Sequence, residues 1–399
     1  MPGESLRDVS PAQDAGAADK QDRVLGRRIG LIGCFESTNI LFPSRLRKLL
    51  VLGCCLGEQR QVQSRPGSQG QTDPCPKESH THQPILRGRQ HFVKGLVSCP
   101  NNRLLLALFL VHLAGVEPLS AEEIRRPVRL ALAEDIGSGD VTTLATVPET
   151  ALAKAVVCAR EPLVVAGVAL AEAAFRELST EVQVTRAVED GHRLAEGKPL
   201  LQVAGPARAL LSAERVALNF LQRLCGIATL TAQFVDAIKG TRAQILDTRK
   251  TTPGWRRLEK YAVACGGGRN HRLGLFDMVL IKDNHLAALR NESPNAIAAA
   301  VERARASYPQ LEVEVEADML EQVEQAVAAG ADIILLDNMQ LVQLRVAVQK
   351  CKDHALTEAS GGVTLAGVRA IAETGVDFIS VGALTHSARA VDIGLDFEL

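Results

Sequence analysis

The sequence predicts an α/β protein in which a mixed region of helices and strands precedes a closed or nearly closed parallel barrel. Apolar residues make up 46% and charged residues 23% of the 399-residue chain, as in ordinary globular proteins. From residue 243 onward, runs rich in Ile, Leu and Val alternate with amphipathic helical patterns, which is typical of βαβ units. No GxGxxG turn follows the first of these runs, which favours a barrel over an open dinucleotide-binding sheet.

Residues 1–116 differ in character from the rest of the chain. They carry 15 Lys and Arg against 9 Asp and Glu, whereas residues 117–399 carry 30 against 37. The stretch Gln59–Gln83 is rich in Gln, Ser, Pro, Gly and Thr and has neither a helical nor a strand period. We therefore interpret residues 1–116 as an atypical, disordered extension. Whether it is part of the natural functional protein stays open.

Two features of this extension resemble functional segments. Its Cys and His residues match no standard zinc-ligand spacing, although they cluster at Cys75, His80, His82, His91 and Cys99. The apolar run Leu104–Val116 is about 13 residues long, whereas a membrane span needs about 20. It also begins too far along the chain for a signal peptide, so a buried or partly ordered helix is favoured.

Composition excludes several classes of partner. The acidic body and an aromatic content of 3% argue against nucleic-acid binding by charge or by stacking. The nine cysteines are odd in number and irregularly spaced, which favours free thiols in a reducing compartment. We expect a cytoplasmic protein with no membrane association.

The mixed region begins with a helix. Ser120 followed by Glu123 is a capping box and predicts a helix over residues 122–133. A polar loop is expected over residues 134–143. Three short strands follow, and they are Lys154–Ala159, Pro162–Gly167 and Val182–Val188. A helix over Ala171–Leu178 lies between the second and the third. A long helix over Ala207–Ile238 leads out of this region.

Six barrel strands are predicted after it. They are Ala243–Asp247, Met278–Lys282, Leu311–Val315, Asp332–Asp337, Leu356–Ser360 and Asp377–Gly382. Their ends read DTRK, IKDN, EVEVE, LLDN, ASGG and SVGA. The carboxyl ends of parallel barrel strands meet at one functional face. Stability alone requires no polar residues at all six ends, so the ends indicate one shared site.

Basic residues gather at this face. They are Arg249, Lys250, His271, Arg272 and Lys282, with Arg215 on the long helix as an addition. Arg suits carboxylate or phosphate with its planar fork, and Lys offers a point charge. Salt bridges to Asp247, Asp283 and Glu259 account for some of these bases. The remainder favour a polyanionic ligand.

Acids and glycines complete the face. Glu314 and Asp337 stand on consecutive strands, and Glu312 and Glu316 share the face of Glu314. These carboxylates indicate Mg²⁺ or bound hydroxyl groups, or else pair with the bases. Glycine lets backbone N–H groups approach an anion, so phosphate is expected at Ser360, Gly361 and Gly362 and at Gly382 and Ala383. A turn is the alternative for the first segment.

The stretch of residues 245–285, ILDTRKTTPGWRRLEKYAVACGGGRNHRLGLFDMVLIKDNH, resembles the nicotinate-nucleotide pyrophosphorylase (carboxylating), or quinolinate phosphoribosyltransferase, family. SAERVALNFLQRLCGIAT, EVEVE, LLDN, ASGG and EDIGSGDVTT match that family too, and the resemblance covers about residues 118–397. It implies an N-terminal α/β sandwich domain, residues 117–227, and an incomplete parallel α/β barrel, residues 228–399, whose last residues return to the first domain. It also implies a homodimer or higher oligomer with shared active sites.

The implied reaction joins quinolinate to phosphoribosyl pyrophosphate and gives nicotinate mononucleotide, pyrophosphate and CO2, with Mg²⁺. The resemblance assigns the quinolinate carboxylates to Arg249, His271, Arg272 and the partner's Arg215, and the carboxylates or pyrophosphate to Lys250 and Lys282. It assigns the ribose hydroxyls and Mg²⁺ to Glu314 and Asp337, which with Lys250 are the expected catalytic residues. The 5′-phosphate is assigned to the two glycine segments.

Three other functions stay open at this point. One is a Schiff-base lyase with Lys282 as nucleophile, which would leave the other bases without a role. Another is a transferase of the same fold that acts on a different aromatic acid. The third is a metabolite-binding protein without catalysis.

Overall fold

The computed structural model describes residues 116–398. The extension, with its Cys and His cluster, therefore lies outside the described residues, as does nearly all of the apolar run. Among residues 116–398, none of the helices combines the length and apolar character that a membrane crossing demands.

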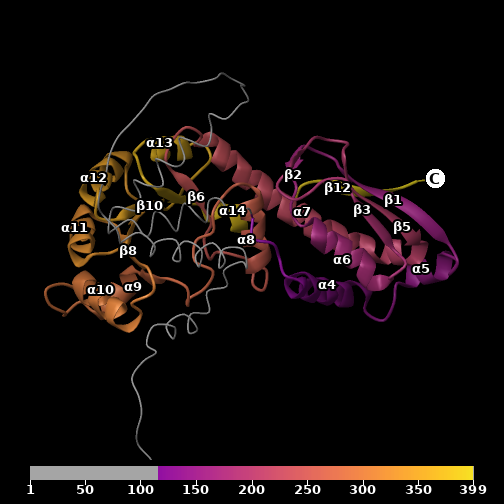
Figure 1. Cartoon of the computed structure of the whole chain (residues 1–399), viewed down its shortest axis with the longest axis horizontal. Coiled ribbons are helices and arrows are strands. Elements are labelled where there is room, and N and C mark those ends of the chain that lie inside the picture. Colours follow the sequence, from indigo (N-terminus) through magenta and orange to yellow (C-terminus); the bar gives the residue numbers. More distant parts are fainter. Residues whose placement is uncertain (1–115, 399) are drawn as a thin grey trace, which may run out of the picture. The chain divides into compact units, whose positions relative to one another are not determined.

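The first part of the fold is an antiparallel sheet covered by helices (Figure 1). The sheet has the order β12-β1-β5-β3. Its strands are β1 (Leu152–Ala159), β3 (Gln183–Arg186), β5 (Pro199–Pro206) and β12 (Ile393–Phe397), and the pair β2 (Leu163–Val164) and β4 (Arg193–Leu194) stands beside it. Helices α4 (Ala121–Ile136), α6 (Val168–Leu178) and α7 (Ala207–Ala237) pack on one another.

The predicted capping box at the start of α4 is confirmed. The Ser120 hydroxyl accepts from the Glu123 amide, and the Glu123 carboxylate accepts from the Ser120 amide. The loop predicted for residues 134–143 is too long. Helix α4 continues to Ile136, and Asp140 caps the short helix α5 (Val141–Thr146) by accepting from the Thr143 amide. A helix of six residues is too short to show a helical period in the sequence.

The second part is a six-stranded parallel sheet with the order β6-β11-β10-β9-β8-β7. The strands are β6 (Gln244–Leu246), β7 (Val279–Ile281), β8 (Val313–Ala317), β9 (Ile333–Asp337), β10 (Leu356–Ser360) and β11 (Phe378–Ser380). All six predicted strands are present, and β8 begins two residues later than predicted. The two edge strands β6 and β7 are not paired with each other in the described part of the chain, so the barrel is incomplete.

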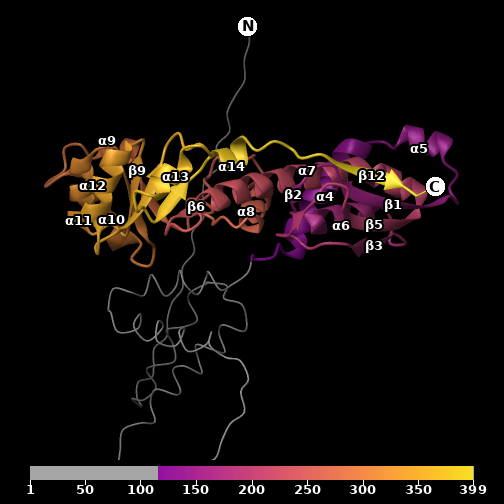
Figure 2. The same cartoon turned by 90° about the horizontal axis from the view of Figure 1, so that it is seen from above.

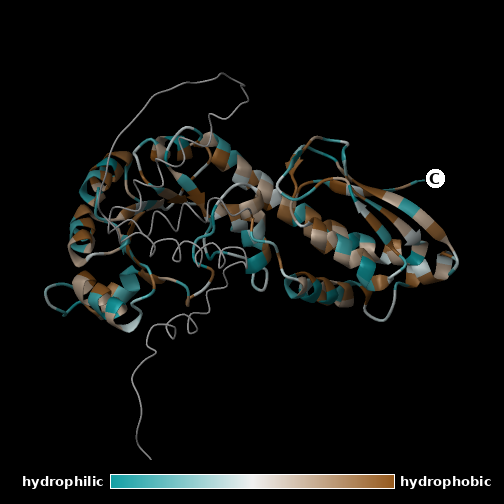
Figure 3. Ribbon diagram, in the orientation of Figure 1, coloured by the Kyte–Doolittle hydropathy of each residue, from teal (hydrophilic) through white to brown (hydrophobic). Residues whose placement is uncertain are grey.

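Helices surround this sheet on its outer side (Figure 1). They are α8 (Arg256–Cys265), α9 (Asp283–Ala288), α10 (Ala296–Ser307), α11 (Leu320–Ala329), α12 (Leu341–Cys351), α13 (Val368–Ala372) and α14 (Ala383–His386). Figure 3 shows apolar strands inside and helices with one apolar and one polar face outside. The fold class is confirmed: an antiparallel N-terminal sheet with helices, then an incomplete parallel α/β barrel.

Two connections cross between the parts. Helix α7 contacts β1 and β5 of the first sheet and β6 of the second. The last strand β12 returns to pair with β1 in antiparallel register, with Val157 opposite Leu395 (Figure 2).

The barrel interior holds charge as well as apolar side chains. Val315, Ile334 and Ile379 are fully buried, as expected for strands covered by helices. The described part of the chain also buries charged side chains to 1% exposure or less, and these are Asp247, Glu259, Lys260, Glu314 and Glu358. Buried charges need partners, and each of these five lies on or beside the barrel.

Candidate active site

The carboxyl ends of the strands bring the polar residues to one rim. Asp337 is the last residue of β9, and Ser360, the last residue of β10, lies opposite it in register. Lys282 directly follows β7, and Glu316 lies in β8 beside it. We call the polar face at these strand ends the rim. Because all six strands are parallel, their ends present one continuous surface.

Two arginines, Arg249 and Arg272, lie close together at the rim. The guanidinium Nε of Arg249 is buried and has no hydrogen-bond partner. Burial lowers the pKa of Arg272, and the charge of the nearby Arg249 lowers it further. Like charges held together in a partly buried place favour an anion that neutralises both.

The rim carboxylate on β8 is Glu316. Its Oε2 accepts from Lys282 Nζ at 2.6 Å. Glu314 lies two residues earlier and one layer deeper, with an exposed side-chain fraction of 0%. Alternation along the strand keeps both side chains on the inner face but at different depths. The role predicted for Glu314 stays a prediction, and the structure places Glu314 in the barrel interior and Glu316 beside Lys282 at the rim.

His271 points into the barrel rather than toward the rim. Its Nε2 lies 3.1 Å from Oε2 of Glu314 and 3.5 Å from Oε2 of Glu358. Its Nδ1 accepts a hydrogen bond of 2.7 Å from the Arg272 amide. Because Nδ1 accepts, the proton of the neutral ring is on Nε2, the atom that faces the two carboxyl groups.

Burial governs the charge of this interior group. It raises the pKa of Glu314 to about 8, although the charges of Arg272 and Lys282 oppose the rise. It also raises the pKa of Glu358 to about 8, and the neighbouring Glu314 adds to that rise. Burial lowers the pKa of His271. The carboxyl pair thus retains protons at neutral pH.

These three side chains have the proximity of a metal site but the wrong tautomer. Their ligand atoms all lie within 4.8 Å of one another. A histidine that binds a metal through Nε2 donates a hydrogen bond from Nδ1. Here Nδ1 of His271 is an acceptor, so Nε2 carries the proton and is not a free ligand.

Backbone conformation at the end of β10 depends on glycine. Gly361 has a φ of 93° and Gly362 a φ of 57°. A Cβ at Gly361 would lie 2.9 Å from the Asn338 amide nitrogen and would overlap the Asn338 side chain. The side-chain amide of Asn338 in turn donates to Oδ2 of Asp337 at 2.7 Å. Gly361 therefore allows the ends of β9 and β10 to meet.

The segment after β11 meets Lys250. A Cβ at Gly382 would lie 3.2 Å from Cδ of Lys250 and 3.0 Å from Nε2 of His386. The Thr385 hydroxyl donates to the Lys250 carbonyl at 2.8 Å. Lys250, Gly382 and His386 therefore share one place on the rim. His386 was not predicted as a site residue, although its position one helical turn after Gly382 could have indicated that it lies at the rim.

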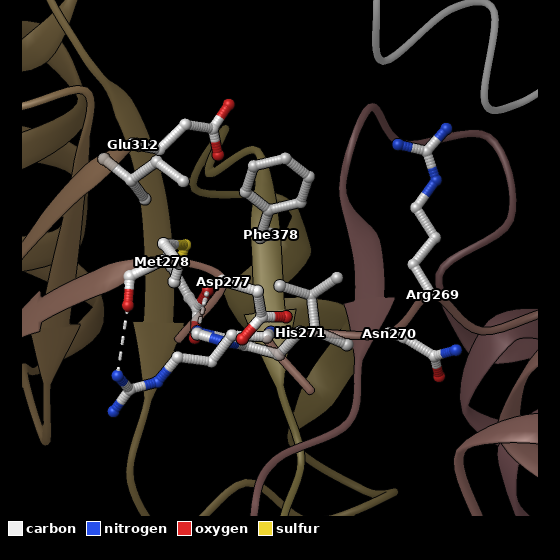
Figure 4. Close-up of a pocket in the computed structure, with 11 residues that line it drawn as sticks. Arg269, Asn270, His271, Asp277, Met278, Glu312 and Phe378 are labelled. Carbon is white, nitrogen blue, oxygen red and sulfur yellow. Dashed lines mark hydrogen bonds and ion pairs between the residues drawn. The ribbon is translucent and has the colours of Figure 1, made fainter. Parts of the chain in front are cut away.

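A cavity of about 250 Å³ lies inside the barrel. Its lining extends from Ile333 and Phe378, the first residues of their strands, to Leu246 at the end of β6, and it includes His271 and Arg272 among the predicted site residues. Figure 4 shows Glu312 and Phe378 on one side of it and Arg269 directed away from it. The other predicted site residues do not line this cavity.

Arg215 is the predicted site residue that belongs to the first part of the fold. It is exposed on α7. One turn earlier on the helix, the Ser212 hydroxyl donates to Asp140 at the start of α5. Arg215 therefore lies beside the N-terminal helices of its own chain.

Both parts of the chain are similar to known proteins. Residues 140–225 and 227–396 match the models of the quinolinate phosphoribosyl transferase N-terminal and C-terminal domains. The chain is 49% identical over 278 residues to the nicotinate-nucleotide pyrophosphorylase [carboxylating] of Mycobacterium leprae, a match that covers 68% of this chain and 96% of that protein. It is 44% identical over 267 residues to a probable enzyme of that name from Bacillus subtilis, with 67% and 90% covered.

Solved structures agree. The nicotinate-nucleotide pyrophosphorylase of Francisella tularensis superposes with a TM-score of 0.67 at 38% identity. The superposition covers 71% of this chain and 99% of that one. The match to the C-terminal domain model, residues 227–396, spans the six parallel strands and the rim.

Proposed function

The chain belongs to the quinolinate phosphoribosyltransferase family, and from this premise we propose how its rim residues perform the reaction. The enzyme transfers the phosphoribosyl group of phosphoribosyl pyrophosphate to quinolinate, with decarboxylation, and gives nicotinate mononucleotide, pyrophosphate and CO2. This step belongs to de novo NAD biosynthesis. Both reactants are multiply charged anions, as the basic rim requires.

The pair of arginines carries the proposal for quinolinate. Arg249 has an unpartnered buried Nε, and Arg272 is destabilised by the charge of Arg249. A dicarboxylate supplies two negative groups that satisfy two guanidinium forks at once. Arg249 and Arg272 therefore bind the quinolinate carboxylates. The backbone amide of Arg272 donates to Nδ1 of His271, and this contact helps to fix the backbone at Arg272.

The opposite side of the rim suits the ribosyl donor. Lys250, beside Gly382 and His386, binds pyrophosphate or the 5′-phosphate. Ser360, Gly361 and Gly362, with Gly382 and Ala383, offer backbone close to the phosphate. Lys282 donates to Glu316 in an ion pair, and this contact occupies the nitrogen that a Schiff-base lyase would use as its nucleophile.

Glu316 and Asp337 fit a magnesium ion bound with the donor. They are carboxylates at the ends of neighbouring strands, and hard oxygen ligands with room for water and phosphate are what Mg²⁺ prefers. When bound, Mg²⁺ neutralises charge on the pyrophosphate. The same carboxylates hold the ribose hydroxyls and stabilise the positive charge that develops on the ribose ring.

Catalysis then rests on alignment and on charge. The rim holds the quinolinate nitrogen against the ribose carbon that loses pyrophosphate, and alignment of this kind removes much of the entropic barrier. After the new bond forms, the ring nitrogen is cationic, and its charge stabilises the electron pair that loss of CO2 leaves on the adjacent carbon. That carbon then takes up a proton from water, which gives nicotinate mononucleotide. No side chain forms a covalent bond to substrate in this scheme.

We also propose a homodimer in which Arg215 of one protomer reaches the rim of its partner. Its exposed position beside α5 supports this, because in its own chain it lies away from the barrel. The four described cysteines are all free, which supports a reducing compartment such as the cytoplasm.

A product assay tests the function. Purified protein, quinolinate, phosphoribosyl pyrophosphate and Mg²⁺ are expected to give nicotinate mononucleotide with equimolar pyrophosphate and CO2. Replacement of quinolinate by nicotinate, which has one carboxylate, is expected to remove turnover. Turnover with nicotinate alone would support a different aromatic acid. Tight binding of both substrates without pyrophosphate release would support a metabolite-binding protein.

A further inference from the structure

Two consecutive residues of α8 are charged, oppositely so, and buried. Glu259 has an exposed fraction of 0% and Lys260 of 1%. Neither belongs to the rim, and neither is used in the scheme above. Their partners lie at the two ends of residues 247–252, which we call the rim loop and which carries Arg249 and Lys250.

Lys260 holds the first end of the rim loop. Its Nζ donates to Oδ1 of Asp247, and it donates to the His271 carbonyl at 3.0 Å. The same Asp247 oxygen accepts from the His271 amide at 2.8 Å. The pair Asp247–Lys260 thereby joins the end of β6 to the segment that carries His271 and Arg272.

Glu259 holds the second end. Its Oε2 accepts from the Thr252 amide at 3.1 Å, and its Oε1 accepts from the Thr252 hydroxyl at 2.8 Å. Arg223 of α7 donates to Oε1 of Glu259 at 3.0 Å and to the Ala388 carbonyl at 2.7 Å. Both carboxylate oxygens of Glu259 thus accept hydrogen bonds, which lowers the cost of burying the charge.

The spacing of these contacts matters for the chemistry. The Asp247 and Thr252 anchors bracket four residues. Between the anchors, the Lys250 amide donates to the Thr248 hydroxyl at 3.1 Å, the Lys250 carbonyl accepts from the Thr385 hydroxyl at 2.8 Å, and the Thr251 hydroxyl accepts from Arg256 at 3.0 Å. The Arg249 Nε is buried without a partner. The position of the guanidinium therefore depends on the backbone of the rim loop, which the two anchors hold at its ends.

We propose that Glu259 and Lys260 are positioning residues that hold the rim loop at both ends and so aim Arg249 and Lys250 at the substrates. The inference rests on the proposed function for the identity of those substrates. A purely structural role for the buried pair would affect the stability of α8 and the sheet alike. If the pair positions the rim loop, its replacement loosens the rim loop while α8 and the sheet keep their stability.

Glu259→Gln is the first test variant. Glutamine keeps the shape but has one acceptor oxygen, so it cannot accept from both Thr252 groups and from Arg223. We expect backbone amides 248–251 to exchange with deuterium at least tenfold faster, with unchanged exchange in β8 and β9. We expect kcat/KM for quinolinate to fall at least tenfold. Glu324→Gln, in the exposed pair with Lys350, is the matched control and should retain wild-type behaviour.

Thr252→Val tests the same anchor from its other side and keeps the protein measurable if Glu259→Gln fails to fold. Since Thr252 and Glu259 form the same anchor, the double variant should be little worse than the more severe single variant. For the Asp247 end, Asp247→Asn with Lys260→Met removes both charges without leaving one unpaired. It should accelerate exchange in the rim loop as well.

Wild-type exchange and kinetics in Glu259→Gln and Thr252→Val would overturn the inference. Uniformly faster exchange through α8 and the barrel strands would also overturn it, because that pattern signals global destabilisation. Exchange in the rim loop is measured without the reaction. A wild-type protein that forms no nicotinate mononucleotide would therefore refute the proposed function and leave the exchange result to be judged by itself.

Discussion

Lys282 Nζ donates to Oε2 of Glu316 at 2.6 Å, at the carboxyl ends of the neighbouring strands β7 and β8. The contact places an acid and a base at the rim, while Glu314 is sealed one layer below. A ligand that approaches the rim meets the outer pair first. The roles proposed for rim carboxylates therefore depend on Glu316 and Asp337.

We predict that Glu316→Gln lowers kcat by about tenfold or more, because one charge that stabilises the developing cation is lost. Steady-state assays at saturating substrates and Mg²⁺ check this. Glu321→Gln, on the exposed side of α11, is the control. Wild-type turnover in Glu316→Gln, with loss in Glu314→Gln, would return the role to the deeper residue.

We predict that Gly361→Ala raises the KM for phosphoribosyl pyrophosphate and lowers kcat, because the new Cβ displaces Asn338 beside Asp337. Gly375→Ala is a matched control: its φ of 91° is similar, but its Cβ would lie 3.6 Å from Val348. Both variants should lose about 1–2 kcal/mol of stability from the left-handed backbone. Equal activity in the two variants would contradict the prediction.

The interior carboxyl pair predicts a pH dependence of stability. The pKa of Glu358 is about 8 in the folded protein against an ordinary 4.5, so the folded state holds a proton that the unfolded state releases. Stability from this source is present below about pH 4.5 and declines as the pH rises toward about 8. Thermal unfolding should show this decline in the wild type.

Glu358→Gln tests that assignment, because a neutral amide does not titrate. The variant should gain stability relative to the wild type as the pH is raised from 5 to 8.5, by about 1 kcal/mol or more. Measurement of Tm for both proteins across this range checks it. Parallel curves would show that the carboxyl pair is ionised in the folded protein.

Deletion of residues 1–116 should leave kcat and KM essentially unchanged, because every rim residue and both anchors of the rim loop lie beyond residue 116. The truncated protein retains Glu117, which pairs with Arg257. Comparison of the two proteins in the product assay checks this. A soluble, folded truncated protein without activity would show that the extension contributes to the site.

Much of the barrel could be predicted from the sequence because parallel strands buried on both faces are continuous apolar runs. Ile333–Asp337 and Leu356–Ser360 were predicted within one residue. In β8 the alternation of Glu and Val extends before the strand, so the pattern did not reveal that pairing begins at Val313. Strand β5 was missed in the first part because it runs directly into α7 at Pro206 without a turn signal.

The rim residues could be found from the sequence because they follow apolar runs, but their depth could not. Glu314 and Glu316 occupy the same face of one strand, and only the register with β7 and β9 shows which reaches the rim. The direction of the His271 ring depends on the Arg272 amide and on Glu358, which lies 87 positions away. Lys260 and Glu259 resemble an exposed helical pair in sequence, and tertiary packing alone buries them.

The activity of Lys250→Ala tests the central claim most directly. Lys250 lies beside Gly382 and His386 at the rim, whereas Lys352, exposed after α12, offers a control of the same chemistry. We predict that Lys250→Ala retains its Tm within about 2 °C but forms no measurable nicotinate mononucleotide, and that Lys352→Ala forms it at the wild-type rate. Full turnover by a folded Lys250→Ala protein would contradict the account.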